Sequence, residues 1–421
     1  MTSKLGWSLL RHFRKVWVRV VSFAVLAVVT AIVAQIVAPL IPSAWTVKLG
    51  AESVDKVLDV LAASMLTVTT FSLAIAISAF AAAASTATPR ATALLQEDAT
   101  AQNVLATFLG AFLFSLVGMI ALQAGFYTQA GRLVLFVMTG IVIMAVVIAL
   151  LRWISHLMTF GRMGDTLDRV EAAAKASLDR RLESPFLRGR PLHAAIPSTC
   201  IPVLSNEIGY IQHVDVGKLD SCAEELQTQV WLAVLPGTFV HEASALLHVE
   251  KPPSSDDALR QLRGAFTIGA ERSFDQDPRF GLIVISEIAS RALSPAVNDP
   301  GTAISVVGRL VRILARWKDD SDSRIEYQSV FVPPVHPDDM IDDAFRPIVR
   351  DGAATLEVQI RLQKALHALG TISPAVFGAP AAAMAAEAMT RARDALTENE
   401  YRLHSRVPAL DPGKPEAISR A

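Results

Sequence analysis

The chain has 421 residues, of which 52% are hydrophobic and 19% charged, and its net charge is −1. This balance, with a mean hydropathy of +0.39, excludes a disordered polymer and a generally basic nucleic-acid-binding protein. It is also too apolar for an ordinary soluble enzyme of this size.

Four stretches near the N-terminus contain no Asp, Glu, Lys or Arg: residues 20–47, 60–89, 99–131 and 133–151. Each holds a strongly apolar run, and a helix needs about 20 apolar residues to cross the hydrocarbon core of a membrane. We therefore predict four transmembrane helices, at about 18–40, 58–84, 103–125 and 133–152. A fifth charge-free stretch, 365–386, is rejected because His, Gly and Pro residues interrupt it.

Basic residues flank these spans unequally. Nine lie at the N-terminus, in the second inter-helix loop and after the fourth span, whereas three lie on the opposite side. The side richer in Lys and Arg is normally cytoplasmic, which predicts a multi-pass protein of the bacterial cytoplasmic (inner) membrane with both termini inside. Trp7, Trp17, Trp45 and Trp153 fall near predicted span ends, as in an aromatic belt. The first apolar run is too long for a signal peptide, so we predict an uncleaved anchor.

The charge divides at the end of the fourth span. Residues 1–152 contain 10 Lys and Arg against 5 Asp and Glu, a net charge of +5, which leaves −6 for the remainder. An acidic soluble domain is not expected to dock on anionic lipid or on nucleic acid. Its two cysteines, Cys200 and Cys222, are expected to be reduced thiols and provide no metal framework.

The sequence after the fourth span shows both helix-like and strand-like patterns. The expected fold class is therefore an α-helical membrane protein with four transmembrane helices plus a cytoplasmic α+β domain. A connecting helix and linker occupy 153–195, a small β-containing module 196–250, a helical domain 258–404 and a disordered tail 405–421. Within the module we predict strands at 209–215, 228–235 and 239–249 and a helix at 219–226. Within the helical domain we predict helices at 279–293, 301–317, 343–370 and 382–401 and an edge strand at 325–332.

Span two carries small and hydroxyl side chains at three- and four-residue steps, which places them on one stripe of the helix. They are Ser64, Thr67, Thr70, Ala74, Ser78 and Ala81. One interpretation is close helix–helix packing, because small residues let backbones approach. The other is a pore lined by hydroxyl groups. No ionisable side chain lies deep in any span, which disfavours a proton-driven transporter.

The densest polar group of the soluble part surrounds two predicted helix starts, Asp277-Pro278 and Asp299-Pro300, where Asp suits the N-cap and Pro the first helical position. The candidate ligand or partner residues are Arg272, Asp275, Asp277, Arg279, Glu287, Arg291, Asn298 and Asp299. Helix caps, a turn Asn and an i, i+4 pair between Glu287 and Arg291 explain most of them. The alternative is a site for a small anion or a partner protein at the two helix N-termini.

Catalytic motifs are mostly absent: there is no P-loop, dinucleotide-binding glycine motif, Cys-x-x-Cys or nucleophile elbow. His241-Glu242 begins like a zinc-protease pair, but Ala245 stands at the fifth position, and His248 falls in a strand-like run. His213 and Asp215 alternate on one strand face without a third ligand. No cofactor or metal is therefore predicted, and an enzyme is the least favoured class.

Several motifs together resemble the bacterial family of predicted membrane proteins called domain of unknown function 2254. These are Thr88-Pro89-Arg90, the run from Gly209-Tyr210 to Asp215, Pro236-Gly237 with Phe239-Val240, the segment from Phe274 to Gly281, and the segment from Arg291 to Pro300 followed by Thr302-Ala303. The resemblance extends to about Gly370, with Thr88 where Ser is expected and Val297 where Ile is usual. It implies a multi-pass membrane protein with a cytoplasmic domain and no established activity.

Two functional hypotheses follow. The first is a homo-oligomeric, channel-like or transport-related assembly in the lipid bilayer, because four spans seldom enclose a pathway alone, with a cytoplasmic regulatory domain. The second is a membrane-anchored sensor or interaction module that binds an anion or partner protein through the segment from Arg272 to Pro300.

Overall fold

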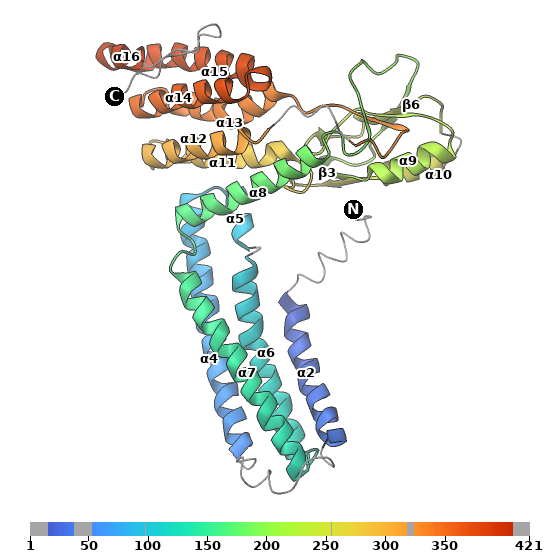
Figure 1. The fold of residues 1–421 in the computed structure, drawn as a ribbon, viewed down its shortest axis with the longest axis vertical. Coiled ribbons are helices and arrows are strands. Elements are labelled where there is room, and N and C mark those ends of the chain that lie inside the picture. Colours follow the sequence, from blue (N-terminus) through green and yellow to red (C-terminus); the bar gives the residue numbers. More distant parts are fainter. Residues whose placement is uncertain (1–15, 38–52, 97, 254, 318–323, 407–421) are drawn as a thin grey trace. The chain divides into compact units, whose positions relative to one another are not determined.

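The computed structural model describes residues 16–37, 53–96, 98–253, 255–317 and 324–406. Its described residues divide into two compact units, with the second beginning at Thr166 (Figure 1). The short segment Thr86–Ala91 belongs to the second unit, although the residues on both sides of it belong to the first. The predictions for Trp7, Trp45 and the tail after residue 406 lie outside the described residues.

The first unit contains four helices that are long and apolar enough to cross a membrane. They are α2 (Val16–Val37), α4 (Val54–Thr86), α6 (Ala99–Gln123) and α7 (Gln129–Leu157), and the short α5 (Pro89–Gln96) follows α4. Neither Gly nor Pro interrupts α4 over its 33 residues, which at 1.5 Å per residue extend about 50 Å. Side chains of Asp98 and Thr128 cap the N-termini of α6 and α7. The prediction of four apolar helices is confirmed.

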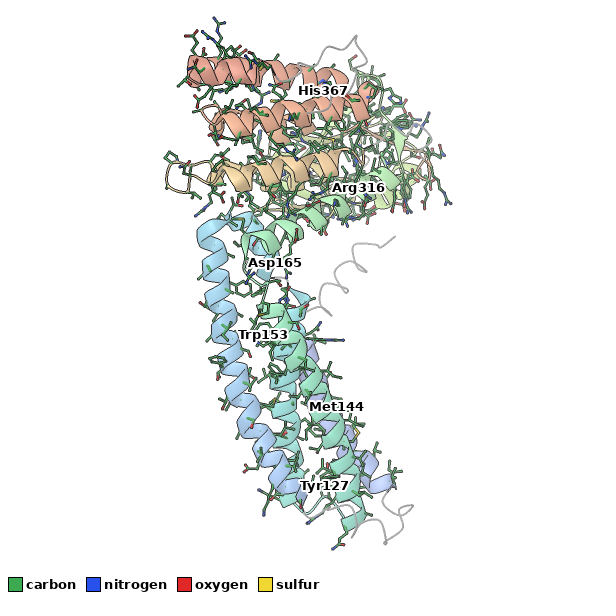
Figure 2. All side chains as sticks on the ribbon, turned by 60° about the vertical axis from the view of Figure 1, so that its left-hand side comes forward. Tyr127, Met144, Trp153, Asp165, Arg316 and His367 are labelled. Carbon is green, nitrogen blue, oxygen red and sulfur yellow. The ribbon has the colours of Figure 1, made fainter. Side chains whose placement is uncertain are left out.

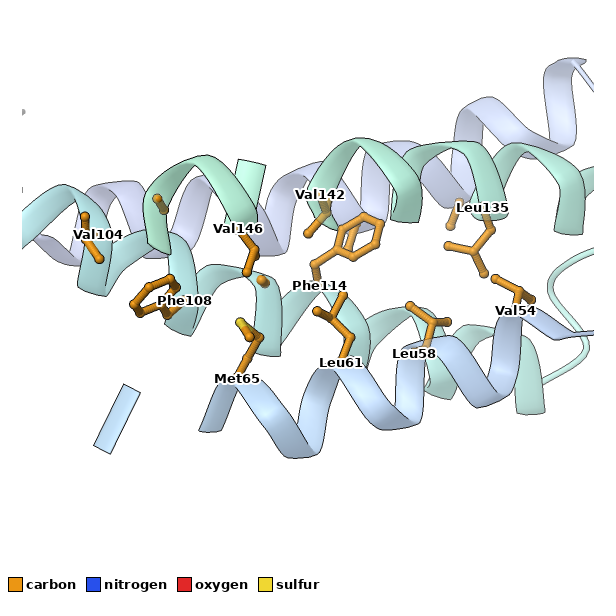
Figure 3. Close-up of a cluster of buried hydrophobic side chains, with 14 of the residues drawn as sticks. Val54, Leu58, Leu61, Met65, Val104, Phe108, Phe114, Leu135, Val142 and Val146 are labelled. Carbon is orange, nitrogen blue, oxygen red and sulfur yellow. The ribbon is translucent and has the colours of Figure 1, made fainter. Parts of the chain in front are cut away.

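Apolar side chains hold this unit together. Leu58, Leu61 and Met65 of α4 face Phe108 and Phe114 of α6 in one buried cluster, to which α7 also contributes (Figure 3). Many large apolar side chains on the opposite faces of these helices are exposed. Since soluble proteins rarely expose such surfaces, the outer faces have the character of surfaces that contact lipid.

Trp153 lies near the end of α7, beyond Met144 along the same helix, as predicted (Figure 2). It is 3% exposed, however, and its ring lies close to the rings of His156 and Phe160. An aromatic belt would require this indole to reach the membrane interface. Trp153 is therefore a packing residue of the first unit.

The second unit includes helix α8 (Met163–Glu183) from Thr166 onward, and it contains two small sheets. The five-stranded sheet has the order β1-β8-β4-β6-β2 and the three-stranded sheet the order β5-β3-β7. The strands are β1 (Arg190–Pro191), β2 (Ile201–Leu204), β3 (Gly209–Val214), β4 (Val230–Leu232), β5 (Phe239–Val240), β6 (Ala245–Val249), β7 (Phe266–Gly269) and β8 (Val330–Val332). Helices α9 (Val216–Glu225) and α10 (Asp256–Arg263) accompany them. The β structure thus draws strands from outside residues 196–250.

Two strand predictions are wrong in detail. The predicted edge strand 325–332 is reduced to β8, which lies inside its sheet with parallel partners on both sides. The predicted strand 239–249 is two strands in different sheets. A turn separates them, in which the Ser244 N–H donates to the His241 carbonyl at 2.8 Å. Sequence patterning detects apolar alternation but does not show which strand becomes the neighbour.

Helices complete the second unit: α11 (Pro278–Ala292), α12 (Pro300–Leu314), α13 (Pro337–Asp351), α14 (Leu356–Ile372), α15 (Pro374–Ala395) and α16 (Glu398–His404). The prediction of one helix over 343–370 is wrong, because the chain breaks at Gly352, whose N–H caps the Ile348 carbonyl. The prediction of one helix over 382–401 is also wrong, because Leu396 is extended and Thr397 forms a capping box with Glu400.

Candidate functional site

The N-terminus of α11 is built around the buried carboxylate of Asp277. Its Oδ1 accepts the backbone N–H groups of Arg279 and Phe280 at 3.1 and 3.2 Å, as an N-cap does. Its Oδ2 accepts Nε of Arg272 at 2.7 Å, and the Arg272 guanidinium lies over the Phe280 ring. Burial raises the pKa of Asp277, although the Arg272 charge and these hydrogen bonds act in the opposite direction. The predicted cap is confirmed, and the carboxylate also joins a buried ion pair.

Arg181 on α8 is the charged residue of this region that the sequence analysis missed. It is 3% exposed, and its Nε, Nη1 and Nη2 atoms are all buried without a hydrogen-bond partner among the described residues. Burial lowers its pKa to about 10, against the opposing influence of the Asp277 charge. The guanidinium is therefore still protonated at neutral pH. The sequence offered only a second arginine after Arg180 near a helix end, which is a common surface pattern.

The residues before Asp277 connect three elements. Arg180 of α8 donates to the carbonyl oxygens of Phe274 and Asp275 at 2.8 and 3.0 Å. The Gln276 side chain accepts the Val214 N–H at the end of β3. The Asp275 side chain accepts the Ser273 hydroxyl, and this pair is exposed. The segment from Phe274 to Asp277 thus has a clear structural role.

The turn between β4 and β5 lies against the same ion pair. Gly237 has a φ of +96°, and a Cβ atom added there would lie 2.3 Å from Asp277 Oδ2 and 2.8 Å from Arg272 Nη2. Only glycine fits both the backbone conformation and this close approach. The Pro236-Gly237 motif is explained by the same residues that define the cap.

Arg279 points to another helix. Its guanidinium donates to Asp343 at 2.6 Å and to Asp339 at 2.7 Å, and both carboxylates belong to α13. Arg279 therefore joins α11 to α13, and its charge is balanced within the chain.

Glu287 pairs differently from the prediction. Its carboxylate forms an ion pair with Arg90 of the segment Thr86–Ala91, instead of the expected i, i+4 pair with Arg291. Burial raises the pKa of Glu287, against the Arg90 charge and hydrogen bonds from Arg90 and Thr88. Local spacing on one helix predicted the wrong partner because a residue 197 positions away reaches the same carboxylate.

The predicted site residues do not converge as one group. Asn298, with a φ of +49°, and Asp299, which accepts the Thr302 N–H at 3.0 Å, are exposed at the start of α12. Helix α11 has 15 residues and is about 22 Å long. Because α11 and α12 form a hairpin, their N-termini lie at opposite ends of it. Arg291 lies near the second end, away from the Arg272–Asp277 pair.

The sequence analysis also missed a row of ion pairs between α8 and the α12 region, which we call the ionic seam. Glu171 of α8 is 5% exposed and accepts hydrogen bonds from Arg309 at 2.7 Å and Arg312 at 2.8 Å. Burial alone would raise its pKa, but hydrogen bonds and charges of Arg312 and Lys175 hold the pKa at about 2. Asp179 and Arg316 continue the seam at 2.8 Å. The signal in the sequence was three arginines on one face of the helix at 301–317 and acidic residues on one face of α8.

The histidine and carboxylate pairs have local structural roles. Asp215 caps α9 by accepting the Lys218 N–H at 3.0 Å, and His241 Nδ1 accepts the Ala243 N–H within a turn. Within the described residues, no group of three or more His, Cys, Asp or Glu side chains could hold a metal ion. Cys200 and Cys222 are free thiols.

The small-residue stripe of α4 is exposed along its whole length. Ser64, Thr67, Thr70, Ala74, Ser78 and Ala81 all face outward, while Leu58, Leu61 and Met65 pack inward. Thr67 donates to the Ala63 carbonyl at 3.0 Å and Thr70 to the Thr67 carbonyl at 2.9 Å. These hydroxyls therefore need no partner from outside the helix. The stripe does not serve packing inside the first unit.

Comparisons with known proteins agree with the four-helix unit. The model of the family "Predicted membrane protein (DUF2254)" matches residues 14–368. Uncharacterized proteins of Mycobacterium bovis and of two strains of Mycobacterium tuberculosis are 31% identical over 266 residues, which cover 60% of this chain and 50% of theirs. The chain thus spans about half the length of the curated relatives it matches. No solved structure matches it. The chain belongs to the DUF2254 family of predicted membrane proteins.

Proposed function

We propose that the chain forms a homo-oligomeric, channel-like or transport-related assembly in the bacterial inner membrane, whose second unit is cytoplasmic and regulates helix α4. In this proposal both termini are cytoplasmic. The proposal rests on the segment Thr86–Ala91. This segment directly continues α4 but belongs to the second unit. A rearrangement around Glu287 therefore acts on the end of α4.

The anchor of this segment is chemically specific. Arg90 donates to the Glu287 carboxylate, and Thr88 adds a second hydrogen bond to it. Glu287 is three-quarters buried, so loss of its partner would leave a poorly solvated carboxylate. Breaking the pair is expected to release the segment rather than merely weaken a surface contact.

The exposed stripe of α4 supports the oligomeric part of the proposal. Small residues allow a helix of another copy to approach closely, and the outer face of α4 offers such residues over about five turns. If the stripe only contacts lipid, its substitution by leucine should leave the assembly unchanged.

The experiment compares the ion flux and the assembly of the wild type and its variants, with the flux measured after reconstitution in liposomes. We expect ion flux from the wild type, a changed flux for Arg90→Gln, and loss of assembly for Ser78→Leu or Thr70→Leu, measured by mass in detergent. Ile77→Leu, on an exposed apolar position of the same helix, is the matched control and should behave as wild type. Silent liposomes together with a monomeric mass would refute the proposal.

A second candidate is a membrane-anchored sensor or interaction module in which the four helices only anchor the second unit. The Thr67 and Thr70 hydroxyls are compatible with this candidate, because each donates its proton to a carbonyl of its own helix and can face lipid without an outside partner. This candidate would be supported over the first if the protein is monomeric and a ligand raises the thermal stability of its second unit.

A further inference from the structure

We propose that Arg181 and Arg272 bind an oxyanion of the phosphate type beside the start of α11. The starting observation is the unpartnered guanidinium of Arg181, which is 97% buried and has three nitrogen atoms without hydrogen bonds among the described residues. Native proteins rarely leave a buried charge in this state, because its desolvation costs several kcal/mol unless a partner compensates it.

Within the described residues, the ion pairs of this region do not include Arg181. Arg272 and Asp277 form one ion pair, and Arg90 and Glu287 form another. Asp277 exerts an electrostatic influence on Arg181, but its carboxylate is already used by Arg272 and by two backbone N–H groups of α11. A carboxylate that already accepts these three donors has little capacity left for a second guanidinium. The compensating anion is therefore not supplied by this network.

The form of the free donors indicates the chemical class. A guanidinium presents parallel N–H groups that match two oxygens of a phosphate, sulfate or carboxylate, and a spherical ion such as chloride uses only part of them. Of Arg181, Arg272 and Asp277, Arg272 is the one that reaches the surface. Its side chain is 18% exposed, against 2% for Asp277. An oxyanion would enter along Arg272 and be held between the two arginines.

This inference gives a ligand class to the regulatory role proposed for the second unit, but the binding itself does not depend on ion flux or on oligomerisation. Free phosphate and a phospholipid headgroup share the same chemistry, so the experiment uses both as probes. Failure of binding and failure of the proposed function are therefore separate outcomes.

The experiment uses the full chain in an uncharged detergent, with thermal unfolding followed at constant ionic strength while sodium phosphate replaces sodium chloride. We expect a saturable rise in Tm of about 3–6 °C at tenfold excess over the Kd. Equilibrium dialysis with labelled phosphate should give one site per chain. Phosphatidylglycerol in place of phosphate identifies a headgroup as the source if it alone produces the rise.

Arg181→Met should abolish both the rise in Tm and the retained phosphate. Without phosphate it should be no less stable than the wild type, because an apolar side chain of similar length replaces an uncompensated charge. Arg316→Met, which removes an exposed arginine of the same unit, is the matched control and should keep the full phosphate response. A response that survives Arg181→Met, or a wild type that retains no phosphate and responds to neither probe, would overturn the proposal.

Discussion

The two units of this chain differ in how charge contributes to the contacts between their helices. In the first unit α4, α6 and α7 meet through Leu58, Phe108, Phe114 and similar side chains. In the second unit the contact of α8 with α12 is an ionic seam, centred on a glutamate that is 5% exposed. The difference teaches that apolar packing suffices where lipid can cover the outer faces, whereas the second unit also uses charge to fix which helix meets which.

The largest expected effect tests this difference with one substitution in each unit. Phe345→Ala removes a fully buried ring from α13 and should destabilise the second unit by about 3–5 kcal/mol. Phe114→Ala removes an equally buried ring from α6 but should cost less, because lipid tails are as apolar as the helix interface and only packing is lost. Hydrogen exchange, measured separately for peptides of each unit, gives the loss of stability that each substitution causes. Equal losses would contradict the contrast between the units.

The ionic seam provides the next effect. Glu171→Gln should destabilise the second unit by roughly 3 kcal/mol, because Arg309 and Arg312 lose their shared carboxylate. Leu167→Val, one turn earlier on α8, is a control for small packing changes and should cost no more than about 1.5 kcal/mol. A loss confined to this smaller range for both variants would mean that the seam contributes little.

The same carboxylate predicts an acid dependence. Its pKa is about 2 in the folded protein against an ordinary value of 4.5, so the folded state binds its proton less readily than the unfolded state. The stabilisation is therefore complete above pH 4.5 and is lost as the pH falls toward 2. Chemical denaturation of the wild type and Glu171→Gln across this window should show a smaller slope for the variant. Parallel curves would rule Glu171 out as the source.

A smaller effect is expected at the turn against Asp277. Gly237→Ala should cost about 1–3 kcal/mol, because the residue has a φ of +96° and its new Cβ would contact the Asp277–Arg272 pair. Gly378→Ala is the control, since a Cβ there meets nothing within 4 Å and lies in helix α15. The control should be neutral or slightly stabilising in thermal unfolding. The reverse order of the two variants would contradict the close approach.

The smallest effect is expected at the exposed end of the seam. Asp179→Asn removes a carboxylate that pairs with Arg316, with side chains 38% and 47% exposed, and should cost no more than about 1 kcal/mol. Added salt should reduce the difference from the wild type further. A loss as large as that of Glu171→Gln would show that burial does not set the strength of these pairs.

Local residue patterns predicted much of the second unit. Asp277-Pro278 and Asp299-Pro300 marked the starts of α11 and α12, because an N-cap and a first-turn proline act within a few residues. The pairing of Glu287 with Arg291 failed for the opposite reason: it assumed that the nearest opposite charge on the helix is the partner. Arg181 could not be predicted, since burial of a charged side chain depends on what other elements cover it.

The sequence by itself determined four long apolar helices and the caps of α11 and α12, because hydrophobic length and cap chemistry are local properties. Only the tertiary structure decided which face of α4 packs and which is exposed, and that the segment Thr86–Ala91 belongs to the second unit through Arg90 and Glu287. It also decided that α11 and α12 begin at opposite ends of their hairpin. These features depend on contacts between residues far apart in the chain, whose partners are selected by the packing of the whole unit.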